Sequence, residues 1–299
     1  DDNGKIIACI NEERIKRVKQ CSDFPSLSIQ ECLKIGDISS KDINYVAIGG
    51  KMAAPMQDTM GKDSFLYRMA SNLSLFGITK FFTGNNFFCF ILKHIFSNKY
   101  LLSFNSHNTI KNNLQKIGIK SKIEYFDHHL CHNISAMIGS GYDRGYAFSL
   151  DAGGDFASSA LYSFNKNKLV NVKTTPLYHS PAFFYAYITK LLGFVPIRHE
   201  GKISGLSASG DSTETFKIIS QRINMKNNKF NVIGFYGYHE IEWLKKKLNK
   251  YSKEDIAAGI QKVLEITVLT YLKTNINKIK DNTIVLSGGV FANVKLNQL

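Results

Sequence analysis

The sequence predicts an α/β fold made of two related halves. Three observations support this class. Short apolar strands alternate with helical segments, three strands between residues 145 and 174 form a meander, and glycine-rich turns follow two of the strand ends. The chain has 299 residues, 44% of them hydrophobic, so it can bury a large core, and intrinsic disorder is excluded.

The first half is predicted over residues 1–144. A strand at residues 6–10 follows the turn Asn3-Gly4, and a helix at residues 25–35 precedes a strand at residues 43–48. Residues 51–120 are aromatic-rich and helical, with a break at Thr83-Gly84-Asn85, and are predicted to form an insertion. A strand at residues 122–126 then leads into a helix from 128 to about 138, which Asp127 can cap.

The second half is predicted over residues 145–299. Its meander comprises strands at 145–150, 158–164 and 168–174, and the first strand ends at Asp151 before a Gly-rich turn. The actin-like (ASKHA), or ribonuclease H-like, ATPase fold begins each half in this way. Helices are expected at about 182–192, 213–223, 241–248 and 253–273, followed by a strand at 283–286 and a helix from 290.

Both ends of the chain are predicted to be cut. A hairpin turn needs a strand on each side, and none precedes the strand at residues 6–10. The chain stops inside the helix predicted at 290–299. We therefore expect the second half to be incomplete.

The chain is basic, but its charge pattern does not indicate a nucleic-acid partner. It carries 38 Lys and Arg against 24 Asp and Glu, a net charge of +14, and only six of the basic residues are Arg. The one dense run, at residues 245–247 and 250, falls on a predicted helix and is predicted to be a solvated face, with a polyanion contact as the alternative. An anionic substrate such as a nucleotide suits the overall sign better.

Cysteine usage and hydropathy favour a cytoplasmic location. The five cysteines are scattered and form no C-x-x-C pair, which argues against a disulfide scaffold. The most apolar stretch, residues 73–96, is interrupted by Lys80, Lys93 and His94, so no membrane span is predicted, although an interfacial helix is an alternative. The N-terminal residues are polar and acidic, unlike a signal peptide.

The strongest chemical signal is a histidine cluster in the run Asp127-His128-His129-Leu130-Cys131-His132. His128 and His132 are four residues apart, so on a helix they share one face and can bind one metal ion. Capping or core packing is the alternative for these side chains. For His129, packing and a role as a general base both stay open.

A second signal is the turn that begins at Asp151. Gly153 and Gly154 let the backbone wrap a phosphate, and Asp151, at a strand end, can hold a metal ion or an acceptor hydroxyl. Asp155 follows the two glycines. A Gly-rich β-turn with acidic side chains and no ligand is the alternative.

Two further blocks carry glycines beside polar residues. Lys202 lies between Gly201 and Gly205 and can contact a phosphate or a carbonyl, although a surface loop would have the same composition. Gly288 and Gly289 follow the last predicted strand, where backbone N–H groups can approach a phosphate.

Taken together, these blocks resemble the NodU/CmcH-type O-carbamoyltransferases, which include nodulation-factor, cephamycin and tobramycin enzymes. The resemblance spans nearly the whole chain, with residues 51–120 matched least. The matching strings are Glu12-Glu13-Arg14, Asp127-His128-His129 with His132, Asp151 with Gly153 and Asp155, His199-Glu200-Gly201-Lys202 with Gly205, and Ser287-Gly288-Gly289 with Asn293.

The resemblance implies a division of labour between two domains. A C-terminal YrdC-like domain, which lies outside this chain, joins carbamoyl phosphate and ATP into carbamoyl adenylate. The N-terminal actin-like domain binds that adenylate beside a metal and transfers the carbamoyl group to a hydroxyl of a small molecule or sugar. Fe(II) is the expected metal, with zinc or manganese as alternatives and a role for magnesium left open.

The resemblance also implies roles for individual residues. His128, His132 and Asp151 would bind the metal, and His129, Lys202 and Asp155 would be catalytic. The adenylate would contact a set of charged, amide and glycine residues, namely Arg14, Gly153, Gly154, Gly201, Lys202, Gly205, Gly288, Gly289 and Asn293.

The sequence departs from the family pattern in places. Gln20 stands where many members have His, the opening strand is lacking, and a further acidic metal ligand would lie beyond Leu299. Two other functions stay open: a tRNA threonylcarbamoyladenosine transferase-like enzyme, and a non-catalytic actin-like nucleotide-binding domain. The sequence does not determine the oligomeric state and leaves a homodimer open.

Overall fold

The computed structural model describes residues 4–19, 21, 23–51, 65–97, 104–276 and 283–299. The chain forms two compact units, one of residues 1–53 and 95–126 and the other of residues 54–94 and 127–299. These bounds differ from the boundary predicted near residue 144, because residues 127–144 pack with the second unit. The division into two related halves stays a prediction.

The first unit contains a two-stranded parallel sheet with helices. Strand β1 (Tyr45–Gly49) pairs with β2 (Lys122–Phe126). The helices of this unit are α1 (Glu12–Lys16), α2 (Ser26–Ile35) and α6 (Phe104–Lys116), and a 3₁₀ turn, η1, covers Ser40–Asp42. The strand predicted at residues 6–10 is wrong: this segment is irregular, since a strand needs backbone hydrogen bonds to a neighbour.

The second unit is built on a four-stranded sheet in the order β5-β4-β3-β8. Strands β3 (Arg144–Gly154), β4 (Ala157–Asn165) and β5 (Lys168–Pro176) are antiparallel neighbours, which confirms the predicted meander. Strand β8 (Ile284–Ser287) runs parallel to β3 and pairs Ser287 with Ser149. The carboxyl ends of β3 and β8 therefore lie side by side, at the edge where α/β sheets bind ligands.

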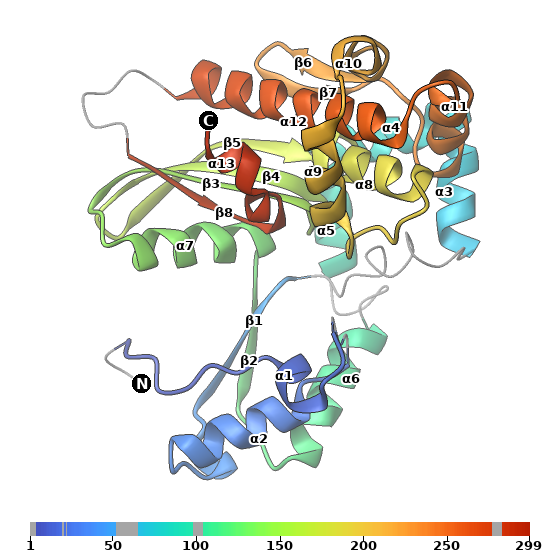
Figure 1. The fold of residues 1–299 in the computed structure, drawn as a ribbon. Helices are drawn as coiled ribbons and strands as arrows, with labels where there is room; N and C mark the ends of the chain where they lie inside the picture. The colour runs from blue at the N-terminus through green and yellow to red at the C-terminus, as the bar shows by residue number, and fades with distance from the viewer. Residues whose placement is uncertain (1–3, 20, 22, 52–64, 98–103, 277–282) are drawn as a thin grey trace. The chain divides into compact units, whose positions relative to one another are not determined.

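Helices cover both faces of this sheet (Figure 1). Helix α7 (His128–Ser140) packs on one face, where Met137 meets Ala147, Phe164 and Val285. The main core lies on the other face, beneath α8 (Pro181–Leu191) and α12 (Lys253–Asn275). Alternation of side chains along β3 produces this division, because Ala147 faces α7 while Phe148 stacks on Tyr271 of α12.

The remaining helices of the second unit are short. The described part of the predicted insertion is helical, with α3 (Phe65–Leu75), α4 (Ile78–Thr83) and α5 (Asn86–Ser97), and the predicted break lies between α4 and α5. Residues 52–64 and 98–103 of that insertion lie outside the described residues. The other elements are η2 (Leu177–His179), α9 (Glu200–Leu206), η3 (Ser207–Ser209), α10 (Thr213–Ser220) and α11 (Tyr238–Leu248).

Two predictions near the end of the chain need correction. The helix predicted to run to residue 223 ends at Ser220, and a hairpin of β6 (Ile223–Lys226) and β7 (Lys229–Val232) follows it. The helix predicted from 290 is divided into a 3₁₀ turn, η4 (Gly289–Ala292), and α13 (Val294–Asn297). Asn293 separates them because its extended backbone ends the turn and its side chain caps α13.

The mixed α/β class is confirmed, while the assignment to the actin-like fold stays a prediction. No helix among the described residues has both the length and the apolar character needed to cross a membrane.

Candidate metal centre and adjoining cavity

Helix α7 places His128 and His132 on one face, above the end of β3. Asp127 caps the helix by accepting a hydrogen bond from the Leu130 amide at 3.0 Å, and the helix ends at Gly141, which has a φ of 71°. The cap fixes the first turn, and this turn carries His128.

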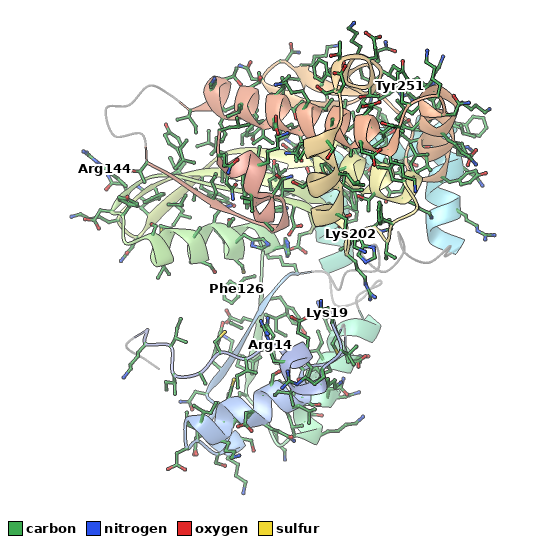
Figure 2. All side chains as sticks on the ribbon, viewed as in Figure 1. Arg14, Lys19, Phe126, Arg144, Lys202 and Tyr251 are labelled. Carbon is green, nitrogen blue, oxygen red and sulfur yellow. The ribbon has the colours of Figure 1, made fainter. Side chains whose placement is uncertain are left out.

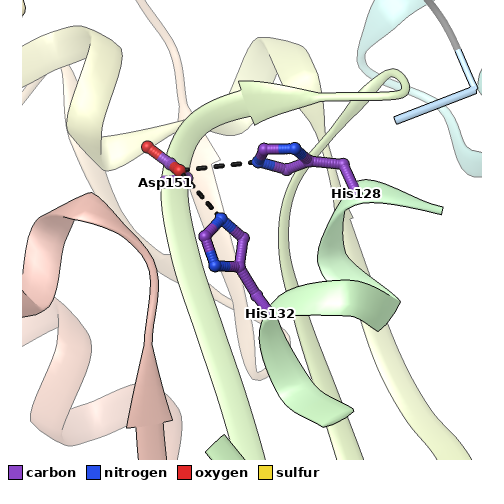
Figure 3. A group of neighbouring side chains, drawn as sticks. All are labelled: His128, His132 and Asp151. Carbon is purple, nitrogen blue, oxygen red and sulfur yellow. Dashed lines mark ion pairs between the residues drawn. The ribbon is translucent and has the colours of Figure 1, made fainter. Parts of the chain in front are cut away.

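The side chain of Asp151 reaches both imidazoles (Figure 3). Its Oδ2 lies 3.5 Å from Nε2 of His128 and 3.3 Å from Nε2 of His132. One ligand atom from each of the three residues lies within 4.8 Å of the others. The structure thus brings together the three residues that were predicted to bind a metal.

The spacing of these atoms fits a metal ion. Two ligands bound at about 2.1 Å and at a tetrahedral angle lie about 3.4 Å apart, close to both observed separations. The Nε2 atom of His128 is buried and makes no hydrogen bond of good geometry with any described residue. Its one contact, with Asp151 Oδ2 at 3.5 Å, leaves room for a cation between the two atoms, and two imidazoles with a carboxylate suit zinc, iron or manganese.

The electrostatics of the cluster keep the carboxylate charged. Burial raises the pKa of Asp151, but the contacts with His128 and His132 outweigh this effect and hold that pKa well below its usual range. The same contact with Asp151 raises the pKa of His128 against the opposing effect of burial. Asp151 is therefore anionic at neutral pH.

Gly154 has a packing role beside His128. A β-carbon at this position would overlap the ring of His128, so the close approach of α7 to β3 requires glycine. Gly153 has its side-chain face filled by Leu177. These contacts lie on the side-chain face of the two glycines, so the phosphate contact predicted for their backbone N–H groups stays a prediction.

Asp155 and His129 also have structural partners. Asp155 is buried, and its Oδ2 accepts a hydrogen bond from the His128 amide at 2.8 Å. His129 is 1% exposed, and its two ring nitrogens contact Ser149 Oγ and the Ala157 carbonyl, each at 3.0 Å. Burial lowers the pKa of His129 to about 4, so the ring is neutral and donates from Nε2 to the carbonyl. These contacts give both side chains a structural role, and the predicted catalytic roles stay predictions.

A cavity of about 390 Å³ adjoins the histidine–carboxylate cluster at Asp151. Its polar lining includes Arg198, Glu200 and Asn293, and its apolar lining includes Tyr185 and Leu264. Predicted cofactor residues Gly201, Gly289 and Asn293 line it together, although they come from distant parts of the chain. The β-carbon of a residue at 289 would lie 3.2 Å from Asp151 Oδ1, so glycine there keeps the carboxylate accessible.

A polar network forms part of the wall of this cavity. Asn293 and Gln261 exchange two amide hydrogen bonds of 2.8 and 3.2 Å, and Tyr185 donates to Gln261 at 3.1 Å. Gln261 is fully buried, so its orientation is fixed. The network holds the Asn293 side chain at the cavity.

Lys202 does not lie between flexible glycines as predicted. Residues 200–206 form helix α9, which carries Lys202 (Figure 2). The Lys202 ammonium lies 5.5 Å from the centre of the Phe194 ring. Neither Lys202 nor Gly205 is among the residues lining the cavity, whereas Arg198, which sequence analysis missed, is. Gly288 has a φ of 90° and packs against the backbone of Leu150, so it shapes the turn.

Arg14 belongs to helix α1 of the first unit, and its predicted contact with the adenylate stays a prediction. Arg198 precedes the His199-Glu200 block directly in the sequence, and this position was the signal that could have identified it.

The fold and the site define a mixed α/β domain with a histidine–carboxylate centre beside a mostly apolar cavity. A family model described as "Carbamoyltransferase N-terminus" matches residues 1–299. The chain belongs to this carbamoyltransferase family, as the sequence resemblance implied.

Individual relatives agree with this assignment. An uncharacterised protein of Methanocaldococcus jannaschii is 29% identical over 98% of this chain and 48% of its own length. Nodulation protein NolNO of Sinorhizobium fredii is 25% identical over 99% of this chain and 40% of its own length. Nodulation protein NolO of Bradyrhizobium diazoefficiens is 25% identical over 57% of this chain. The chain spans about half or less of the length of these relatives.

Proposed function

We propose that this chain is the part of an O-carbamoyltransferase that transfers a carbamoyl group from carbamoyl adenylate to a substrate hydroxyl. The observation that carries the proposal is the position of Asp151, which belongs to the histidine cluster and also lines the cavity. A donor bound in the cavity would therefore present its carbamoyl end next to the candidate metal ligands.

The cavity suits a nucleoside phosphate. Its apolar lining, including Leu264 and Tyr185, can take an adenine ring, and the Arg198 guanidinium can pair with the phosphate. Glu200 can accept hydrogen bonds from ribose hydroxyls, although its Oε1 also accepts from the Ile197 amide at 2.6 Å. These groups provide contacts at both ends of an adenylate.

The transfer step forms one bond and breaks one. The substrate hydroxyl oxygen attacks the carbamoyl carbon, the bond from that carbon to the phosphate oxygen breaks, AMP leaves, and the hydroxyl proton passes to solvent. A divalent metal held by His128, His132 and Asp151 would act as a Lewis acid on the carbonyl or the hydroxyl. Fe(II) is the proposed ion, as the family resemblance implies.

The donor would be made from carbamoyl phosphate and ATP by another domain of the same protein. The acceptor is a hydroxyl-bearing small molecule or sugar. These partners, the use of ATP and a cytoplasmic location belong to the proposal.

The test uses the natural full-length protein with carbamoyl phosphate, ATP and Fe(II). We expect the D151N variant to form carbamoyl adenylate normally, seen as pyrophosphate release, but to lose transfer by at least about a hundredfold. R198Q should raise the concentration of carbamoyl adenylate required for half-maximal transfer. R144Q, whose site lies at the start of β3, should behave as wild type. Unchanged transfer by D151N would refute the proposal.

A further inference from the structure

A second cavity, of about 620 Å³, lies in the same unit on the side of α7 and is separate from the proposed donor site. Strands β4 and β5 contribute Tyr162, Asn171 and Lys173 to its lining, and helix α5 contributes Asn86 and Phe90. The Asn86 side chain donates to the Thr174 carbonyl at 3.4 Å, so α5 is joined to β5 along one wall.

This cavity reaches the amino end of α7, where the metal centre begins. Asp127, His129 and Asp155 all line it. Asp155 also accepts the hydrogen bond from the His128 amide, so one residue joins the cavity lining to a candidate metal ligand. The first cavity meets the same centre at Asp151. The two cavities therefore adjoin the histidine cluster from different elements, the first at Asp151 and the second at His129.

Two lysines give the cavity a positive region. Lys173 and Lys229 both line it, and neither has a carboxylate within ion-pair distance among the residues that the structure describes. The Lys173 ammonium is held at 2.6 Å from both the Asn228 carbonyl and Asn275 Oδ1, which are neutral acceptors. Burial lowers the pKa of Lys173, and the nearby charge of Lys229 lowers it further. An anion between the two ammonium groups would relieve this repulsion.

The rest of the lining suits a carbohydrate. Asn86, Asn171 and Tyr162 provide amide and hydroxyl groups that can donate to and accept from sugar hydroxyls. Phe90 is 59% exposed and lines the same cavity, so its ring can pack on the apolar face of a sugar.

We infer that this second cavity binds the acceptor, and that the acceptor is an anionic carbohydrate, with its phosphate or carboxylate at Lys173 and Lys229 and a hydroxyl directed toward the amino end of α7. The role as acceptor rests on the proposed function; binding of an anionic sugar does not. A sugar phosphate and a sugar acid share the required chemistry, and the test separates them.

The test measures binding by calorimetry to the metal-free, full-length protein, using glucose 6-phosphate, glucuronate, glucose and inorganic phosphate as probes. At least one anionic sugar should bind about tenfold or more tightly than glucose and than inorganic phosphate. K229Q, at an exposed position, and K173Q should each remove most of that difference, while K245Q removes an equal charge on α11 and should have no effect. Circular dichroism checks that each variant is folded.

Four results would overturn the inference: equal affinity for glucose and both anionic sugars, phosphate binding as tightly as the tighter anionic sugar, binding of that sugar unchanged in both K173Q and K229Q, or no binding of either anionic sugar. If binding behaves as expected while D151N still transfers carbamoyl groups, the inferred binding site stands and the proposed function fails.

Discussion

Gly154 lies directly against the imidazole of His128, and a β-carbon at position 154 would overlap the ring atoms Cγ and Cδ2. The glycine therefore determines how closely helix α7 approaches strand β3. It also determines whether His128 lies close enough to Asp151 for both side chains to bind one metal ion.

We predict that G154A destabilises the protein by about 1–3 kcal/mol, because the ring must move to admit the methyl group. The same shift should lower metal affinity by about tenfold or more. Urea unfolding of the metal-free protein and metal titration check the two effects separately.

The control is G139A, on helix α7, where a β-carbon would meet no atom within 4 Å. This change should stabilise the protein by up to about 1 kcal/mol through helix propensity and leave metal affinity unchanged. If G154A behaved like G139A, the packing argument would be wrong.

The buried pair of Arg222 and Glu240 should be a major contributor to stability. Its two hydrogen bonds measure 2.9 and 2.6 Å, Glu240 is fully buried, and the Arg222 guanidinium lies 4.3 Å from the centre of the Trp243 ring. E240Q should cost about 3–5 kcal/mol, since it leaves a charge in the interior without its partner.

The matched control is E214Q, which removes an exposed pair with Lys217 on α10 and should cost less than about 1 kcal/mol. Chemical unfolding of both variants gives the comparison. Similar losses of unfolding free energy in E240Q and E214Q would show that the buried pair stabilises the protein no more than the exposed pair does.

Acid should destabilise the protein through two neutral histidines. Burial lowers the pKa of His129 and of His179 to about 4 each, with the charge of Lys80 adding to the effect at His179. Their pKa in the unfolded chain is about 6.5, so unfolding takes up protons between these values. The free energy of unfolding is therefore highest above pH 6.5, where both histidines are neutral in the folded and unfolded chain. It falls as the pH drops toward 4, by up to about 3 kcal/mol for each residue.

His179 offers the test. Its Nδ1 accepts from the Val232 amide at 3.0 Å, and the amide oxygen of Asn can replace that acceptor without titrating. H179N should therefore show a smaller loss of unfolding free energy between pH 6.5 and 4 than wild type. An unchanged slope would contradict the assignment. His128 has a raised pKa, so its contribution is present at low pH and is lost as the pH rises through that value.

The features of the site that could be predicted from the sequence have short-range physical causes. The spacing of His128 and His132, the Asp127 cap and the position of Asp151 at a strand end all follow from helix and strand periodicity. The hairpin at Asn227-Asn228 was missed, although both residues have positive φ angles, because asparagine tolerates this conformation without the glycine that usually signals it.

Other features depended on the packing of distant segments. Gly153 and Gly154 have the composition of a phosphate loop, but Leu177 and His128 fill the space beside them. Arg198 is a candidate phosphate-binding residue because it lines one cavity together with residues of α9, β3 and η4. Sequence spacing contains no information on such contacts, which arise from the order of the strands in the sheet.

We propose that His128, His132 and Asp151 hold one divalent metal ion. The direct measurement is an anaerobic Fe(II) titration of wild type, the double variant H128A/H132A and the control H239A, whose ring lies 3.0 Å from Asn72 Oδ1 and outside the cluster. Wild type and H239A should bind about one ion per chain, and the double variant should lose at least about a hundredfold in affinity. The proposal would be contradicted if H128A/H132A bound Fe(II) with the affinity of wild type, or if wild type bound none of iron, zinc and manganese.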